Sequence, residues 1–137
     1  MLNIYFDIDG VLLGTKSPKK DVEALLLYAL KNYPDSLFWL TTHCWHGANR
    51  AKEVLSREFD SGFVEKVCEK FQVAFWEDSK TEGIDFDQDF VWFDDNLFES
   101  EKIVLESHYV LDSFFKMNPR DPGMAKKALL FLKSFEK

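Results

Sequence analysis

The amino-acid sequence predicts an α/β fold in which helices cover both faces of a parallel β-sheet. Short apolar runs recur along the chain, segments with helical spacing of apolar residues separate them, and polar side chains follow several of the runs. Strands that alternate with helices favour parallel pairing and right-handed crossovers. We therefore expect a sheet whose ligands bind at the carboxyl ends of its strands.

The first predicted strand is residues 2–6, a nearly continuous apolar run that ends before Asp7. Such a run suits a strand buried on both faces. A helix should follow, with Ser17 as its N-cap, Pro18 in its first turn and its end near Asn32. The chain thus begins with a strand and then a helix.

The rest of the chain continues this alternation. The further predicted strands are residues 37–40, 73–76, 90–93 and 109–111. The further predicted helices are residues 47–59, residues 63–71 and a last one capped by Asp121, which would bury Met124, Ala128, Phe131, Leu132 and Phe135. The acidic segment 77–89 is expected to be a solvated loop, and Trp39, Trp76 and Trp92 are expected in the core. Without a linker or repeat, residues 1–137 should form a single Rossmann-like domain.

Composition excludes some function classes. The formal net charge of −7 argues against nonspecific nucleic-acid binding, which depends on clustered Lys and Arg. Cys44 and Cys68 are too few for a disulfide framework and are not spaced for a zinc site. No apolar run approaches the ~20 residues that a membrane helix needs, and no signal-peptide stretch precedes Asp7. We expect a cytoplasmic protein that does not enter membranes. The sequence leaves its oligomeric state open.

Polar side chains follow three of the predicted strands. They are Asp7 and Asp9, Thr41 and Thr42, and Asp94 and Asp95. In a parallel sheet these side chains converge at one edge, where four carboxylates would repel one another. Either shared protons or a hard cation must offset that repulsion, and Mg²⁺ is the simplest choice because it leaves a position for a phosphate oxygen.

Carboxylates two positions apart suit the two tasks of a phosphoryl transfer. Asp7 would attack phosphorus, while Asp9 would donate a proton to the leaving alkoxide and later activate water. Thr41, with its neighbour Thr42, is placed to contact the phosphate, and Lys80 would complete the clamp.

This arrangement resembles the haloacid dehalogenase superfamily. The segment 7–12 after an apolar strand looks like the first motif of that family, Leu40-Thr41 like the second, Lys80 like the third and the segment 93–95 like the fourth. The resemblance covers roughly the first hundred residues, in the family's order. It implies a magnesium-dependent phosphomonoester hydrolase that forms an aspartyl phosphate on Asp7, because an acid two positions after the nucleophile looks like the phosphatase subset.

The resemblance also implies the roles of the other residues. Asp7, Asp94 and the backbone carbonyl of Asp9 would hold Mg²⁺, and Asp95 would bind it or support its ligands. No segment is long enough for a large cap domain. An open site of this kind suits a large phosphorylated substrate, such as a phosphoprotein or a nucleic-acid end, or a small one enclosed by a neighbouring subunit. Lys66 and Lys70 also precede the fourth motif and remain alternatives to Lys80.

Other interpretations stay open. The chain could be a catalytically silent module that senses phosphate or binds a partner, or a phosphotransferase that uses the same intermediate. The segment 94–96 could be an ordinary helix N-terminus. His43, Cys44, Trp45 and His46 follow Thr41 and could contact substrate, whereas a transition-metal site there lacks a fourth ligand. The sequence does not identify the substrate.

Overall fold

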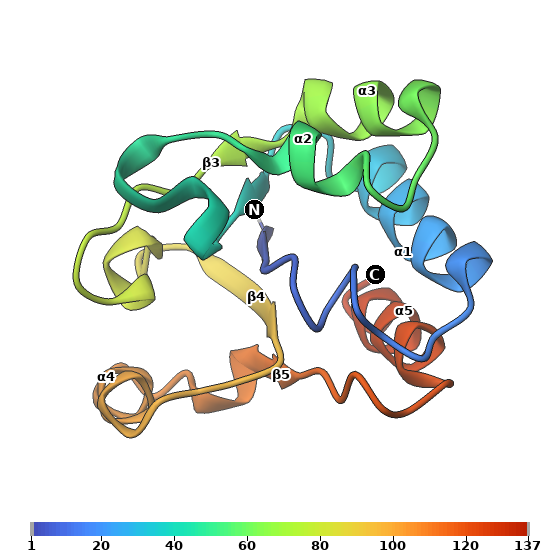
Figure 1. Cartoon of the computed structure of the whole chain (residues 1–137). Coiled ribbons are helices and arrows are strands. Elements are labelled where there is room, and N and C mark those ends of the chain that lie inside the picture. The colour runs from blue at the N-terminus through green and yellow to red at the C-terminus, as the bar shows by residue number, and fades with distance from the viewer. Residues whose placement is uncertain (1, 137) are drawn as a thin grey trace.

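The structure is a computed structural model that describes residues 2–136. Its centre is a five-stranded sheet with the order β3-β2-β1-β4-β5, in which every neighbouring pair is parallel. Helices lie on both faces of this sheet (Figure 1). The predicted fold class is confirmed: the described residues form a Rossmann-like α/β fold without a large cap domain.

The elements have the following bounds. The strands are β1 (Leu2–Phe6), β2 (Leu37–Trp39), β3 (Gln72–Val73), β4 (Asp89–Asp94) and β5 (Phe114–Lys116). The α-helices are α1 (Lys19–Asn32), α2 (Ala51–Leu55), α3 (Ser61–Lys70), α4 (Glu99–Ser107) and α5 (Met124–Lys133). Short 3₁₀ segments lie at Thr42–Gly47, Lys80–Gly83 and Leu111–Ser113. Within residues 2–136, none of the helices has the length and apolar character needed to cross a membrane.

Strand β1 occupies the middle of the sheet and is buried on both faces, as its apolar run predicts. Ile4 and Phe6 contribute to the core on one face, and Tyr5 contributes to the core on the other. Phe6 pairs with Trp39 of β2 and with Phe93 of β4. Because the strands are parallel, the residues that follow this row all emerge at the same edge of the sheet.

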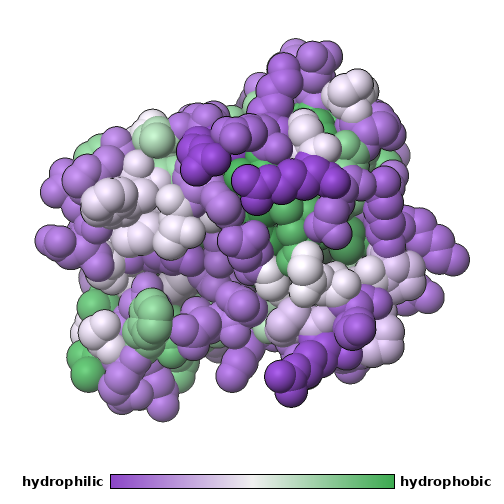
Figure 2. Space-filling model, viewed as in Figure 1, coloured by the Kyte–Doolittle hydropathy of each residue, from purple (hydrophilic) through white to green (hydrophobic). Residues whose placement is uncertain are grey.

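The two faces are covered unequally. Helices α1, α3 and α5 cover one face, at the right in Figure 1, and the larger core lies beneath them, with Trp39 stacked on Phe71 at 3.8 Å between ring centroids. The other face is covered by α4 and the segment Lys80–Gly83, over a smaller core that contains Trp92. Seen from the same side, the surface is mostly hydrophilic, with hydrophobic residues in patches between polar ones (Figure 2).

The predicted helix at residues 47–59 and the predicted strand at 73–76 are largely wrong. His46 and Gly47 have φ angles of 58° and 81°, which break a helical path, so that α2 comprises only Ala51–Leu55. Strand β3 pairs only at Gln72–Val73, and one further bond from the Ala74 N–H to the Trp39 carbonyl ends the ladder. The chain then leaves the sheet.

The predicted strand at residues 109–111 is also wrong, since β5 begins at Phe114. The residues assigned to that strand instead follow α4, where Tyr109 has a φ angle of 58°, and lead into the 3₁₀ segment Leu111–Ser113. Helix α4 itself was not predicted. Only Glu101 and Leu105 of this helix are buried, so the apolar stripe that would reveal it is too thin.

The predicted helix caps differ in detail. The N-cap of α1 is Pro18, which makes no side-chain capping bond, so the assignment of Ser17 to this role is wrong. The Ser17 hydroxyl instead accepts a hydrogen bond of 3.0 Å from the Ala125 N–H, in the first turn of α5. Asp121 accepts from the Gly123 N–H at 2.9 Å, before α5 starts. Phe135, expected on the buried face, follows α5 and is 40% exposed.

Candidate active site

The chain turns sharply after β1. The backbone N–H groups of residues 11–13 all donate to the carbonyl oxygen of Ile8. Gly10 has a φ angle of 77°, and a Cβ at this position would lie 2.6 Å from the carboxylate carbon of Asp95. Only glycine fits both conditions. The turn therefore packs the segment that carries Asp7 closely against the loop that follows β4.

Three carboxylates meet at this edge of the sheet. Asp7, Asp94 and Asp95 each present one oxygen, and these oxygens all lie within 4.8 Å of one another. The pairing of Phe6 with Phe93 sets this arrangement, and the Asp7 N–H extends it with a 3.0 Å bond to the Phe93 carbonyl. Asp7 is 7% exposed and Asp94 is 2% exposed, so most of their hydration is lost. Because ionised carboxylates without hydration are costly, this group requires positive charge nearby.

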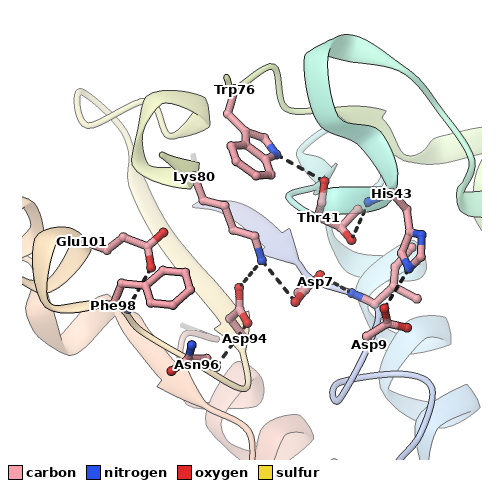
Figure 3. Close-up of polar contacts among 11 residues, drawn as sticks. Asp7, Asp9, Thr41, His43, Trp76, Lys80, Asp94, Asn96, Phe98 and Glu101 are labelled. Carbon is pink, nitrogen blue, oxygen red and sulfur yellow. Dashed lines mark hydrogen bonds and ion pairs between the residues drawn. The ribbon is translucent and has the colours of Figure 1, made fainter. Parts of the chain in front are cut away.

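Lys80 supplies that charge. Its Nζ atom lies 2.8 Å from Oδ2 of Asp94 and 3.2 Å from Oδ2 of Asp7. Figure 3 shows the side chain entering between the two carboxylates from the 3₁₀ segment Lys80–Gly83. Lys66 and Lys70 are the alternatives to Lys80 that the sequence offers, but they lie on α3 and line a different cavity. Lys80 is therefore the lysine that the fold brings to the acids.

Burial and mutual repulsion change the proton affinities of this group. Burial raises the pKa of Asp94 to about 8, and the charge of Asp7 acts in the same direction, against the opposing effect of Lys80. Burial lowers the pKa of Lys80, but the charges of Asp7 and Asp94 outweigh it and leave that pKa above its usual value. Asp94 thus retains a proton more readily than an exposed carboxylate does, as expected where a cation is needed for full ionisation.

The three acids fit a magnesium ion. Two oxygens bound to one octahedral Mg²⁺ at about 2.1 Å lie about 3 to 4 Å apart. Oxygens already within 4.8 Å of one another reach these distances through small side-chain rotations. Donors that are all carboxylate oxygens suit a hard cation better than zinc, which favours nitrogen and sulfur.

Asp9 points away from the other acids. Its carboxylate is 67% exposed, and its Oδ2 atom lies 2.9 Å from Nε2 of His43. The side chain of Asp9 does not belong to the group formed by Asp7, Asp94 and Asp95. The contact with His43 was not foreseen, although the position of His43 just beyond β2 placed it at the correct edge. Asp9 thus lies exposed outside the cleft that the three acids line.

The two threonines differ in their surroundings. Thr41 is fully buried, and its hydroxyl oxygen accepts a 3.3 Å bond from the His43 N–H. Its carbonyl oxygen accepts a bond of 3.2 Å from the indole nitrogen of Trp76. Thr42 is exposed and lines the cleft that contains Asp7 and Lys80. Of the two, only Thr42 lines this cleft.

The cleft over the acids has a volume of about 240 Å³. Its lining residues are Asp7, Thr42, Trp76, Asp78, Ser79, Lys80, Asp94, Asp95, Asn96, Phe98, Ser100 and Glu101. Trp76, which was expected only in the core, has a second role here because it also forms part of this wall. Helix α4 starts at Glu99, so the segment 94–96 precedes the helix and is not its N-terminus. Sequence reasoning missed Phe98 and Glu101 because it missed α4.

The cluster that follows Thr42 does not form a metal site. Cys44 is buried, and its thiol donates to Oδ1 of Asn49 at 3.8 Å. Trp45 packs on the ring of His46 at 3.9 Å between centroids, with half of its surface exposed. Over residues 2–136, the three carboxylates are the one group of His, Cys, Asp or Glu side chains close enough to hold an ion.

Comparison with protein-family models, curated proteins and solved structures finds no match to this chain. Its function must therefore be inferred from the site. The site combines a group of acids suited to a hard cation, a lysine between two of them and an exposed carboxylate nearby.

Proposed function

We propose that the protein is a Mg²⁺-dependent phosphomonoester hydrolase of the haloacid dehalogenase type, which forms an aspartyl phosphate on Asp7. The observation that carries this proposal is the position of Lys80. Its Nζ atom contacts both Asp7 and Asp94, whose oxygens lie with that of Asp95 in one group suited to a cation. A nucleophile, a phosphate contact and a cation site are thus adjacent.

The hydrogen bonds of Asp7 indicate which oxygen attacks. Oδ1 accepts a bond of 2.8 Å from the Ile8 N–H, whereas Oδ2 faces Lys80 and the cleft. Oδ2 would form the bond to phosphorus as the bond from phosphorus to the leaving oxygen breaks. Lys80 would then move its contacts to the phosphate oxygens, where its charge offsets theirs.

Asp9 would transfer the protons of the reaction. It would donate one to the leaving oxygen and then remove one from the water that hydrolyses the aspartyl phosphate. Asp7, Asp94 and Asp95 would hold Mg²⁺, which when bound neutralises negative charge and orients the phosphate. The family resemblance adds the backbone carbonyl of Asp9 to these ligands, and phosphate contacts from Thr41 and Lys80. Thr42 lines the cleft and is a further candidate for such a contact.

The test is hydrolysis of p-nitrophenyl phosphate by the purified protein. We expect activity with Mg²⁺, loss of activity in EDTA and its recovery when Mg²⁺ is restored. Asp7→Asn should reduce turnover to background. Asp35→Asn is the matched control, because Asp35 is exposed in the loop before β2, at the opposite edge of the sheet. Full activity in a folded Asp7→Asn variant would rule out the covalent mechanism.

The same assays on the purified protein distinguish a hydrolase from a catalytically silent module and from a phosphotransferase. Inactivity against a broad panel of phosphate esters, with Mg²⁺ binding retained, would favour the silent module. Faster release of the alcohol than of phosphate, when a second alcohol is added, would indicate phosphoryl transfer to that acceptor. Equal release of alcohol and phosphate is the result expected of a hydrolase.

A further inference from the structure

The cleft extends beyond the place where a phosphate would bind. Phe98 and Glu101, at the start of α4, form part of its wall, together with Asp78 and Ser79. In Figure 3, Phe98 and Glu101 lie on one side of Asp94, and Asp9 lies on the other. The volume of about 240 Å³ is below the range of about 300–1,000 Å³ for drug-sized ligands. The space therefore suits a phosphate with a small attached group.

Glu101 is the unusual residue of this wall. It is 3% exposed, and only its Oε1 atom has a hydrogen bond, of 2.9 Å, from the Phe98 N–H. No lysine, arginine or histidine within residues 2–136 forms an ion pair with it. A buried carboxylate without a cationic partner is costly. Glu101 thus retains an oxygen that can accept a bond from a ligand.

That second oxygen is not sealed from solvent. In the described part of the chain, two fully buried side-chain nitrogen or oxygen atoms have no hydrogen-bond partner, and they are the indole nitrogens of Trp39 and Trp92. Oε2 of Glu101 also has no hydrogen-bond partner in the protein, but it is not one of these fully buried atoms. It therefore remains in contact with solvent. Glu101 lines the cleft, so a ligand bound there can reach this side chain.

The charge of the cleft favours a cation beside Glu101. Its walls carry five acidic side chains and one lysine, namely Asp7, Asp78, Asp94, Asp95, Glu101 and Lys80. Lys80 already forms ion pairs with Asp7 and Asp94. The proposed Mg²⁺ would be bound by Asp7, Asp94 and Asp95. Phe98 is 62% exposed at the rim and offers an aromatic ring, a further surface that attracts cations.

We propose that Glu101 selects the substrate by binding an ammonium group on the alcohol part of the phosphate ester, with Phe98 beside it. The preferred substrates are then small amino-alcohol phosphates. This inference rests on the proposed phosphatase function and adds the substrate class to it. It also decides between the large and the small substrates that an open site allows, in favour of the small ones.

A capping role accounts for the one hydrogen bond of Glu101 and leaves its second carboxylate oxygen without one. A glutamate in the first turn of a helix often accepts a bond from the N-cap N–H, and Oε1 does so here. Capping glutamates need no cleft, and the bond leaves Oε2 without a protein partner. The two roles predict different results, because capping is independent of the substrate.

The first experiment compares two substrates on the wild-type protein with Mg²⁺. O-phosphoethanolamine carries an ammonium group, and n-propyl phosphate has the same chain length with a methyl group in its place. A charge-assisted bond to Glu101 should give the first ester a kcat/KM about 10- to 100-fold higher. Equal values for the two esters would overturn the inference. This comparison needs no variant, so it decides even if Glu101 variants do not fold.

The second experiment assigns that preference to Glu101. Glu101→Gln retains an acceptor for the Phe98 N–H but removes the charge, so the ratio of the two kcat/KM values should fall to about one. Glu106→Gln is the matched control, because Glu106 lies exposed on the same helix outside the cleft, and it should keep the wild-type ratio. An unchanged ratio in a folded Glu101→Gln variant would refute the role of Glu101.

The outcomes separate this inference from the function on which it rests. If the wild-type protein hydrolyses neither these esters nor p-nitrophenyl phosphate, the phosphatase proposal fails, and the substrate inference fails with it. If it hydrolyses all of them but does not discriminate between the ammonium and methyl esters, only the role of Glu101 is refuted.

Discussion

Asp7, the proposed nucleophile, is held in one orientation by contacts to both of its carboxylate oxygens. The Ile8 N–H fixes Oδ1, and Lys80 fixes Oδ2 at the cleft, so the carboxylate cannot rotate without breaking two contacts. A nucleophile held in this way loses little entropy in reaching the attacking geometry. Its neighbour Asp94 is constrained as well, by Lys80 and by the Asn96 N–H at 3.3 Å.

The raised pKa of Asp94 should make binding of the proposed cation depend on pH. Burial and the charge of Asp7 raise this pKa from 3.8 to about 8, so the metal-free folded protein holds a proton that the unfolded chain releases. The stability due to this proton is present below the unfolded pKa and is lost as pH rises through about 8. Mg²⁺ must displace the proton.

We therefore expect Mg²⁺ affinity to increase with pH, by about tenfold per unit while Asp94 is protonated, and to level off above its folded pKa. Calorimetric titration at several pH values, in buffers with different ionisation enthalpies, measures both the affinity and the proton released. Asp94→Asn should bind Mg²⁺ weakly and lose this dependence. An affinity that is constant from acidic to alkaline pH would contradict the raised pKa.

Asp9 should affect the two chemical steps differently. A general acid contributes about 10²–10⁴-fold, so Asp9→Asn should slow hydrolysis of an alkyl phosphate by about that factor. Nitrophenolate needs little protonation, so with p-nitrophenyl phosphate the first step should survive while hydrolysis of the aspartyl phosphate slows. Rapid-mixing measurements should then show a burst about equal to the enzyme concentration. Equal losses for both ester types, without a burst, would mean that Asp9 only maintains the turn.

His43 should act through Asp9. Its Nε2 atom lies 2.9 Å from Asp9 Oδ2, and neither residue lines the cleft over the three acids. His43→Asn should lower kcat by about 10- to 100-fold, because the exposed Asp9 carboxylate loses the contact that orients it. KM should change little. A rise in KM at constant kcat would show that His43 binds substrate instead.

At the scale of elements, the turn after β1 can be tested with two glycines. Gly10 and Gly14 both have positive φ angles, of 77° and 68°, so alanine at either position should cost about 1–2 kcal/mol of stability. A Cβ at Gly14 would meet no atom within 4 Å, whereas one at Gly10 would collide with Asp95. Only Gly10→Ala should therefore also weaken Mg²⁺ binding. Thermal unfolding and Mg²⁺ titration of both variants measure these effects, and equal Mg²⁺ affinities would contradict the proposed packing.

The central elements could be predicted from sequence, and the peripheral ones could not. Strands β1 and β4 are long apolar runs followed by acids, and burial on both faces leaves a strong signal for them. The edge strands β3 and β5 have two and three residues, and their positions depend on which backbone groups of the neighbouring strand they meet. No local pattern encodes that choice.

The candidate site divides in a similar way. The positions of Asp7 and Asp94 follow from the rule that strand ends converge in a parallel sheet. The contact of Asp9 with His43 and the placement of Glu101 depend on side-chain directions and on a helix with a weak apolar stripe. These features arise only when the layers pack together, so the sequence alone did not reveal them.

At the scale of the whole molecule, the unequal layers should differ in stability. Helix α1 buries Val22, Leu25, Leu26, Ala29 and Leu30 over the larger core, whereas α4 buries only Glu101 and Leu105. Segments with few buried apolar contacts open more easily. We expect native-state hydrogen exchange to be faster for the amides of α4 than for those of α1. Equal protection of the two helices would show that the sheet and both layers unfold as one unit.

The short strands at the two edges of the sheet have a consequence for association between chains. Outer strands present unpaired backbone groups that can recruit a second molecule and start aggregation. Here β3 and β5 offer two and three residues, roughly 7–10 Å of ladder, while the longer β1 and β4 lie shielded within the sheet. A strand from a second molecule could form only a few backbone hydrogen bonds with an edge of that length. Concentrated solutions of the folded protein should therefore resist edge-to-edge polymerisation.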